Sequence, residues 1–547
     1  MDPQMHAQPE GAYVWQPPQR GGWTPDWVRD AVFYQIFPDR FARSGRVPEP
    51  GPFEPWEAPP TSNGIKGGDL AGITERLPRL AELGVNALYL NPVFTSASNH
   101  RYHTDDYLAI DPLLGGDAAL RELLEAAHGR EMRLIVDGVF NHTGRGHQPF
   151  VHVLENGSGS PYRDWYHFDQ DRLAGGRPVT PYAPSDGQPD AFARVGYEGW
   201  WGMPALPKLE HANPAVREFL YRVSEHWMAF GADGWRLDVP GEITQPGFWE
   251  GFRSRVKAVR GDAYLVGEVW SVSPEWLAGD RFDGLMDYPL TEAILSFVGG
   301  SHLDQGVLDS QHEYATHVHP TDGPGFAAAL TGLLQAYQPA AVASQLNLLG
   351  SHDTPRFRTV CGGDTAAYRL ATLIQMTLPG APCIYYGDEL GMEGGADPDC
   401  RRSYPADPAW GDQSLRAFVA GAIALRRAHA CLRDGGTWQV GGADGPAFAH
   451  LRADGDEAYV IAVNSGDGPA RLSLSLPLLA GRRLDPVRWD GWPEDPPDGA
   501  GAGSGQGGSG GAGSGGPGAG GQVRTVGQDG GLEVELAARG GLVLRAG

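Results

Sequence analysis

The stretch GADGWRLDVPGE, residues 231–242, decides the expected fold of this 547-residue chain. It is typical of a buried β-strand that ends on a carboxylate, Asp238, two residues after Arg236. Two further acids follow apolar runs in the same way, Glu268 in AYLVGEVW and Asp353 in QLNLLGSHD. A (β/α)8 barrel builds its active site from residues at the C-terminal ends of several different strands. These three acids therefore predict an α/β barrel with a carboxylate site.

Apolar runs of strand length alternate with helical patterns from Ala31 onward. GITERLPRLAELG (72–84) has apolar residues at helical spacing and ends on a glycine typical of a C-cap. Strands are predicted at 31–38, 87–94, 133–140, 234–240, 263–270, 284–289, 345–353 and 383–390. This alternation predicts a closed parallel (β/α)8 TIM barrel. The alternative, an open Rossmann-type sheet, requires a Gly-rich turn after its first strand, and FYQIFPDRF (33–41) contains none.

The chain divides into three predicted parts. Residues 1–30 are an N-terminal extension, 31–435 the catalytic barrel, and 436–547 an antiparallel β-sandwich of short alternating strands. The segment 141–212, after the third strand, is too long for a plain loop and predicts an inserted subdomain. Residues 499–522 are almost all Gly, Ala and Ser, which predicts a disordered loop.

Composition narrows the classes of partner. The net charge of −24 disfavours nucleic acid and anionic membranes and favours a neutral substrate. The four cysteines have no CxxC spacing, so reduced core thiols are expected rather than disulfides or a metal site. The first 30 residues lack the apolar core of a signal peptide, and no apolar run reaches 18 residues. A cytoplasmic protein without membrane contacts is expected.

Four predicted strand ends carry polar residues where a structural core would be apolar: DGVFNH (137–142), GWRLDVPGE (234–242), GEVW (267–270) and GSHDT (350–354). In this order the set resembles the α-amylase family of glycoside hydrolases, family 13, over roughly residues 31–430. The segments MPALPKLE (203–210) and PGAPCIYYGDELGM (379–392) resemble, more narrowly, the neopullulanase, cyclomaltodextrinase and maltogenic amylase group.

Glycoside cleavage requires one carboxyl group to protonate the leaving oxygen and another to attack the sugar or stabilise its cation. Neighbouring barrel strands lie about 4.8 Å apart, so acids on consecutive strands suit the roughly 5–5.5 Å separation of a retaining pair. The resemblance implies that Asp238 is the nucleophile and Glu268 the general acid/base. It implies that Asp353 is the third carboxylate, which holds sugar hydroxyls and favours a distorted ring.

The resemblance also implies substrate-binding roles for five further residues: Tyr102, His142, Arg236, Glu242 and His352. The two histidines are expected to hydrogen-bond the sugar at the cleavage site, and the tyrosine to stack under it. The arginine is expected to fork onto the nucleophile and keep it ionised. The glutamate is expected to shape the acceptor side. Asp137 is expected to support its strand end without taking part in the chemistry.

No cofactor or metal is expected. The calcium site of the group draws on a loop rich in Asn and Asp after the first strand, and here that loop is ARSGRVPEP (42–50). Asp69 alone does not make a site for an ion that needs six to eight oxygens. The group usually carries a β-sandwich of over a hundred residues before the barrel, which helps to form a dimer. Only about 30 residues precede the first strand here, so the oligomeric state stays open.

The predicted function is a retaining hydrolase of α-1,4 bonds in maltooligosaccharides, cyclodextrins or starch-type α-glucans, with some α-1,6 tolerance. A transglycosylase or a trehalose-forming isomerase with the same carboxylates is the alternative. A non-catalytic relative would be expected to lose at least one of the three carboxylates. A metal-dependent amidohydrolase on the same fold requires His-x-His at the first strand, which FYQIFP lacks.

Overall fold

The computed structural model describes residues 13–177, 179–182, 191–493 and 522–546. Eight parallel strands form its centre, in the spatial order β10-β11-β2-β3-β6-β7-β8-β9. A parallel bridge between Met286 and Leu346 joins the two ends of this sheet and closes the barrel. The predicted fold class is therefore confirmed. The barrel strands are β2 Phe33–Ile36, β3 Ala87–Leu90, β6 Arg133–Gly138, β7 Gly234–Leu237, β8 Tyr264–Gly267, β9 Gly284–Leu285, β10 Leu346–Leu348 and β11 Ala381–Tyr385.

Helices cover the outside of the barrel with their apolar faces turned inward. The helix predicted at 72–84 is α3, in which Asp69 caps the N-terminus by accepting from the Gly72 N–H, and Gly84 ends it with φ 100°. The longer helices are α3 Leu70–Leu83, α4 Gly116–His128, α8 Pro214–Phe230, α9 Phe248–Val259, α10 Tyr288–Gly299, α13 Gly323–Ala336, α16 Thr365–Thr377 and α17 Gln413–Ala428. Short helices include α1 Asp26–Arg29, α2 Pro38–Phe41, α11 Gln305–Leu308, α12 His312–His317, α14 Pro339–Val342 and α15 Phe357–Val360.

Several predicted strands end earlier in the structure. The strand predicted at 284–289 stops at Leu285, because helix α10 begins at Tyr288 with a proline in its first turn. The strand predicted at 383–390 stops at Tyr385 and is followed by a short helical turn. The strand predicted at 87–94 stops at Leu90, and an unpredicted hairpin of β4 Phe94–Ser96 and β5 Thr104–Ile110 follows it on the barrel rim.

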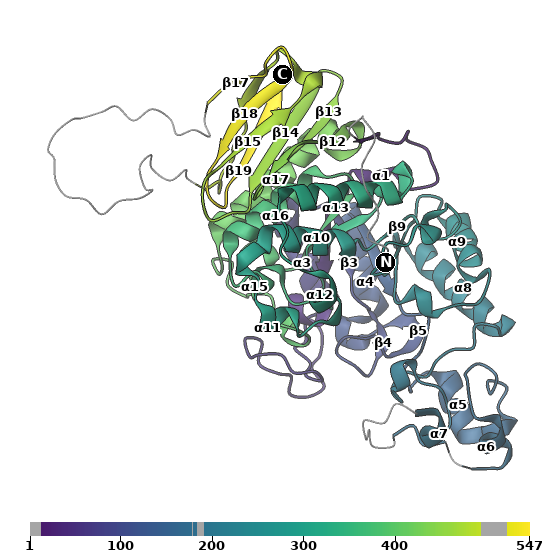
Figure 1. Cartoon of the computed structure of the whole chain (residues 1–547). Coiled ribbons are helices and arrows are strands. Elements are labelled where there is room, and N and C mark those ends of the chain that lie inside the picture. The colour runs from purple at the N-terminus through teal and green to yellow at the C-terminus, as the bar shows by residue number, and fades with distance from the viewer. Residues whose placement is uncertain (1–12, 178, 183–190, 494–521, 547) are drawn as a thin grey trace.

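The segment after β6 forms a small lobe at the lower right of Figure 1. It contains α5 Gln148–Asn156, α6 Gln170–Ala174 and α7 Ala191–Val195. Phe150 packs in its interior against the rings of Phe168 and Tyr197, with centroids 5.6 and 5.0 Å away. An isolated antiparallel bridge pairs His142, shortly after β6, with Lys208 near the end of the lobe. This lobe therefore stands beside the barrel mouth.

The C-terminal part is an antiparallel β-sandwich, as predicted, with a seven-stranded sheet facing a two-stranded one. An apolar cluster that includes Leu451, Val460 and Leu474 lies between the sheets. The strands are β12 Thr437–Asp444, β13 Ala447–Asp454, β14 Glu457–Asn464, β15 Ala470–Ser475, β16 Arg483–Pro486, β17 Arg524–Thr525, β18 Gly531–Leu536 and β19 Gly541–Ala546. The loop predicted to be disordered, 499–522, lies outside the described residues except for Gln522.

The N-terminal extension contributes a strand to this distant sheet. Strand β1, Val14–Trp15, pairs antiparallel with β12, and the Trp15 side chain is buried. The sequence did not predict this pairing. It joins the first described residues of the chain to its last domain.

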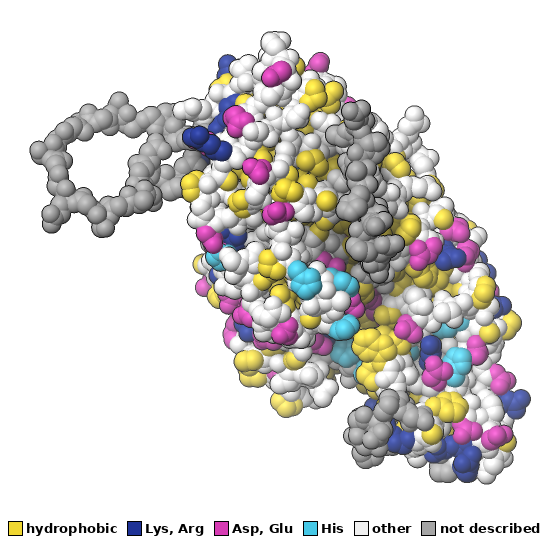
Figure 2. All heavy atoms as spheres, in the orientation of Figure 1, with side chains coloured by type: hydrophobic (Ala, Val, Ile, Leu, Met, Phe, Trp, Pro, Cys, Tyr) yellow, Lys and Arg dark blue, Asp and Glu magenta, His cyan; other side chains and the backbone are white. Residues whose placement is uncertain are grey.

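The surface carries charged side chains of both signs, and the cysteines lie in the interior. Acidic and basic side chains are interspersed on the face shown in Figure 2. All four cysteines are buried and free, as predicted. None of the helices in the described ranges combines the length and the hydropathy that crossing a membrane requires.

Candidate active site

Three barrel strands bring the predicted carboxylates to one mouth. Asp238 follows β7 directly, Glu268 follows β8 directly, and Asp353 lies in the loop after β10. The side chains of Asp238 and Glu268 are each 7% exposed, and that of Asp353 is 28% exposed. Because parallel strands place their C-terminal ends at the same rim, three acids distant in sequence meet here.

Arg236 holds this group together from within the barrel. Its Nη1 donates to Asp238 Oδ1 at 2.8 Å, and its Nη2 lies 3.0 Å from Glu268 Oε2 and 3.9 Å from Asp353 Oδ2. The same Nη1 also donates to both oxygens of Asp137, at 2.9 and 3.1 Å. The guanidinium is fully buried and is shared among four carboxylates. The expected contact with Asp238 is present, but it is a single hydrogen bond and not a two-pronged fork, because the arginine's other donors face neighbouring carboxylates.

The pKa values of Asp238 and Asp353 reflect burial and the charges of their neighbours. Burial raises the pKa of Asp238 well above its usual value, and the negative charge of Glu268 adds to the effect, although Arg236 opposes it. Burial and Glu268 likewise raise the pKa of Asp353 to about 7. The guanidinium of Arg236, and that of Arg401 beside Asp353, offset only part of the effect of burial on these two acids. That Arg236 keeps Asp238 ionised stays a prediction.

Glu268 is held by donors on both of its oxygens. Oε2 accepts from the Val239 backbone N–H at 3.0 Å, and Oε1 accepts from the Trp270 indole N–H at 3.1 Å. The Trp270 ring stacks on Tyr288 with centroids 3.6 Å apart, which fixes the indole. Val239 has φ 35° and ψ 52°, a left-handed conformation that is costly for a β-branched residue.

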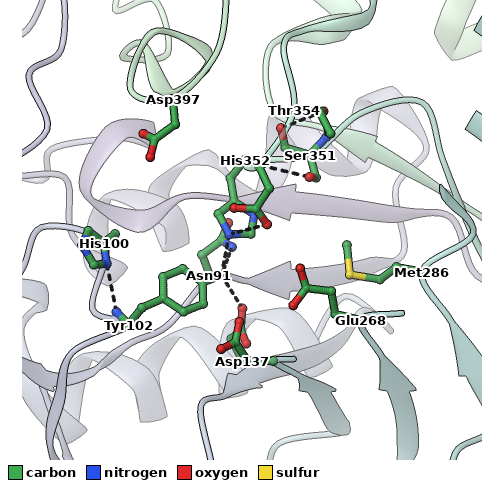
Figure 3. Close-up of polar contacts among 12 residues, drawn as sticks. Asn91, His100, Tyr102, Asp137, Glu268, Met286, Ser351, His352, Thr354 and Asp397 are labelled. Carbon is green, nitrogen blue, oxygen red and sulfur yellow. Dashed lines mark hydrogen bonds and ion pairs between the residues drawn. The ribbon is translucent and has the colours of Figure 1, made fainter. Parts of the chain in front are cut away.

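Asp137, at the end of β6, is a completely buried member of the cluster. Its Oδ2 accepts from the hydroxyls of Tyr89 and Tyr102 at 3.0 and 2.9 Å. Together with the arginine contacts, these bonds occupy both carboxylate oxygens. The geometry agrees with the expected supporting role at the strand end, and Figure 3 shows the side chain below Tyr102 and beside Glu268.

Tyr102 and His352 form the opposite wall of the site (Figure 3). The Tyr102 hydroxyl lies 2.5 Å from His352 Nε2, and the two rings are parallel with centroids 5.4 Å apart. His352 Nδ1 pairs with the Gln35 amide nitrogen at 2.9 Å, so it accepts, and the proton of the neutral ring lies on Nε2. Burial and the charges of Arg401 and Arg236 hold the pKa of His352 well below 6.5, so the ring is neutral.

His142 lies at the base of an aromatic stack that reaches the surface. Its ring stacks on Trp200 at 5.0 Å, and Trp200 stacks on Trp201 at 4.6 Å. Burial lowers the pKa of His142 to about 3. Its Nε2 is buried and has no hydrogen-bond partner within the described part of the chain. Trp201 is 78% exposed and has φ 50°. This tryptophan pair was not predicted as part of the site, although WW at 200–201 lies one residue before MPALPKLE.

Glu242 stands farther out, on the loop after β7. Its Oε2 lies 3.6 Å from Lys208 Nζ, which is also 3.6 Å from Glu198 Oε1. These charges connect the inserted lobe with the strand that carries Asp238. The structure does not bring Glu242 into the Arg236 cluster, so its predicted acceptor-side role rests on its position at the rim.

Arg401, in the loop after β11, is a site residue that sequence reasoning missed. Its Nη2 donates to Asp353 Oδ1 at 3.3 Å and its Nε to the His352 carbonyl at 2.8 Å. Its Nη1 lies 3.0 Å from Asp397 Oδ1, and Figure 3 shows Asp397 above the site. The sequence CRR at 400–402 offered no signal beyond its proximity to the eighth strand.

The predicted absence of a metal stays a prediction. Among the described residues, no three His, Cys, Asp or Glu side chains are grouped so that they could hold an ion. Asp69 accepts from the backbone N–H groups of Gly72 and Ser44 at 2.7 and 2.9 Å, so it serves as a helix cap.

Comparisons with known proteins identify the family of the chain. The sequence model of a family described as alpha amylase, catalytic domain, matches residues 35–420. A cyclomaltodextrinase from a Bacillus species is 40% identical, covering 85% of this chain and 77% of its own length. Neopullulanase 2 from Thermoactinomyces vulgaris is 39% identical, covering 84% and 73%. The crystal structure of a debranching enzyme from Nostoc punctiforme has a TM-score of 0.78 and 40% identity, covering 95% of this chain and 99% of that one.

Proposed function

The chain belongs to the α-amylase family of glycoside hydrolases, and from this premise we propose that it cleaves α-1,4-glucosidic bonds of short α-glucans with retention of configuration. One observation carries the proposal. A single buried guanidinium, that of Arg236, contacts Asp238 at 2.8 Å and Glu268 at 3.0 Å, so two carboxylates from adjacent strands face one space. Paired carboxylates of this kind are the machinery of glycoside cleavage.

The two acids divide the work. Glu268 donates a proton to the oxygen of the leaving sugar while Asp238 attacks the anomeric carbon, and the glycosidic C–O bond breaks. Water then loses a proton to Glu268 and attacks the glycosyl ester, which releases Asp238 and the sugar. Arg236 stabilises the carboxylate that leaves in this second step. All the groups required belong to the chain, so no cofactor or metal takes part in the proposal.

The remaining walls hold the sugar whose bond is broken. The neutral His142 ring presents its buried, unpartnered Nε2 to a sugar hydroxyl without adding charge. Both ring nitrogens of the neutral His352 ring already have partners, Gln35 and Tyr102, so this histidine positions the tyrosine beside the sugar. The Tyr102 ring offers a flat apolar face for stacking. Asp353, with its exposed edge and raised pKa, accepts hydroxyl hydrogen bonds and favours a distorted ring.

Relatives support the choice of substrate. Their names identify them as a cyclomaltodextrinase, a neopullulanase and a debranching enzyme. We therefore propose maltooligosaccharides and cyclodextrins as substrates, with α-1,6 bonds tolerated. Transfer to a sugar acceptor is the second candidate, because the exposed Trp201, which stacks on Trp200 at the outer end of the stack from His142, offers a platform on which an acceptor sugar competes with water.

Product analysis tests the proposal directly. Purified protein is incubated with maltotriose, β-cyclodextrin, pullulan, soluble starch and trehalose, and products are followed by chromatography and by NMR of the first anomer released. Maltose and glucose released first as the α-anomer support the retaining hydrolase. Longer products or trehalose without net hydrolysis favour the transferase or isomerase. A first product in the β-configuration contradicts the assignment of Asp238 as nucleophile.

A further inference from the structure

A second groove is lined by segments that follow the C-terminal ends of barrel strands. The loop after β2 and the loop after β11 border a groove with a volume of about 490 Å³. Two of its walls are tryptophans, Trp56 and Trp410, and its other lining includes Glu57, Arg358, Glu393 and Arg402. Both loops leave the C-terminal ends of barrel strands, as the carboxylates do, so groove and site share one face.

The groove begins next to the site already described. Arg401 donates to Asp353, and the next residue, Arg402, lines the groove. Arg402 is fixed there by two bonds of 2.8 Å to Asp399, and its carbonyl accepts from the Tyr386 hydroxyl at 2.7 Å. The backbone at Arg401 and Arg402 therefore links the carboxylate site to the groove.

The lining suits a neutral polyol. The four charged residues comprise two acids and two bases, so the groove carries no net charge toward a ligand. Arg358 pairs with Glu393 at 2.9 Å, which leaves polar groups to hydrogen-bond hydroxyls rather than an unpaired charge to attract an ion. The Trp56 ring is held by its N–H to the Tyr404 carbonyl at 2.9 Å and by the guanidinium of Arg43, 5.2 Å from the ring centroid. Trp410 is 45% exposed.

We propose that this groove, lined by Trp56 and Trp410, binds a part of the α-glucan chain remote from the bond that is cleaved. Indole faces stack on the apolar faces of glucose units, and a fixed ring loses little entropy in doing so. The groove then adds binding for long chains that a short oligosaccharide does not reach. This inference rests on the proposed function and deepens it, because it assigns a preference for chain length.

The test compares long and short substrates in Trp410→Ala. The ratio of kcat/KM for maltoheptaose to kcat/KM for maltotriose is expected to fall about fivefold, chiefly through KM. Leu478→Ala is the matched control, since Leu478 is 60% exposed in the distant C-terminal sandwich, and it leaves the ratio unchanged. A Trp56→Phe variant keeps an aromatic face. Its ratio of kcat/KM for maltoheptaose to kcat/KM for maltotriose is expected to fall less than that of Trp410→Ala. Calorimetric titration of maltoheptaose into the Asp238→Asn protein, with and without Trp410→Ala, checks binding without turnover.

The two ways of failing are distinguishable. An unchanged ratio and unchanged maltoheptaose affinity in Trp410→Ala overturn the groove assignment while the hydrolase stands. A wild-type protein that turns over none of the α-glucans overturns the proposed function itself.

Discussion

The backbone N–H of Val239 donates to the Glu268 carboxylate at 3.0 Å, and Val239 adopts a left-handed conformation to do so. The residue after Asp238 is thus bent so that its amide points at the acid on the next strand. A β-branched residue in this conformation costs about 1–3 kcal/mol. The strain is maintained because the barrel fixes both strand ends.

Replacing Val239 by glycine is expected to stabilise the protein by about 1 kcal/mol, because glycine adopts positive φ freely. Val239→Ala is the matched control, since it removes the same methyl groups but retains a Cβ and therefore gains less. Urea unfolding of all three proteins measures the difference. A glycine variant less stable than the alanine variant would show that Val239 carries no backbone strain.

Azide distinguishes the roles of the two acids. Asp238→Gly and Glu268→Ala are each expected to lose about 10³-fold or more in kcat on maltotriose while they fold normally. In Asp238→Gly, azide attacks from the vacated side and yields the β-glycosyl azide. In Glu268→Ala, azide attacks the intermediate and yields the α-glycosyl azide. NMR of the products assigns each residue, and exchanged configurations would reverse the assignment.

The pKa of Asp353 predicts a dependence of stability on pH. Its pKa is raised from 3.8 to about 7 in the folded protein, so the stability that its proton contributes is present below pH 3.8 and is lost as pH rises through 7. Asparagine does not titrate, so Asp353→Asn does not lose this stability as pH rises. The variant's free energy of unfolding relative to wild type is expected to rise by about 3 kcal/mol between about pH 4.5 and about pH 8.5.

Urea unfolding at both pH values checks this expectation. Glu82→Gln, at an exposed position on α3, serves as the control and shows no such rise. A difference between Asp353→Asn and wild type that stays constant with pH would contradict the raised pKa.

Trp201 predicts an effect on acceptors. Trp201→Ala removes the exposed end of the stack that begins at His142. At high maltotriose concentration, the ratio of transfer products to hydrolysis products is expected to fall about two- to tenfold, because water then competes better. Met203→Ala, a loss of a 38% exposed side chain in the same lobe, is the control. An unchanged ratio in Trp201→Ala excludes the platform.

Removal of metal is expected to leave the enzyme active. Exhaustive chelation should preserve kcat on β-cyclodextrin within about twofold, since the proposed reaction uses carboxylates alone. Thermal unfolding before and after dialysis checks for a structural ion. A loss of activity or a fall in melting temperature that calcium restores would refute the metal-free assignment.

The barrel was predictable from sequence because its strands are short apolar runs in a repeating pattern. Their ends were not, because GLMDYP continues as an apolar run across the turn from β9 to α10. Strand β12 escaped prediction since a bulge between Val440 and Gly442 breaks its alternation. Strand β1 has only two residues, too few to show an alternation of apolar and polar side chains.

The site was predictable where strands carry it. Asp238, Glu268 and Asp353 follow apolar runs, and the barrel brings such ends together. Arg401 and Trp201 lie in loops, whose conformation cannot be predicted from hydrophobic periodicity. Their contacts with Asp353 and Trp200 are therefore visible only in the structure. The sharing of Arg236 among four acids was equally hidden, since pairing in sequence with Asp238 says nothing of Asp137 on another strand.

The pairing of β1 with β12 has a consequence for how the chain is made. Trp15 leaves the ribosome early, but its partner, Trp438, follows more than four hundred residues later. Until β12 has been made, Trp15 lacks the strand it pairs with. A chain that stopped after its last barrel helix would leave this segment without its partner.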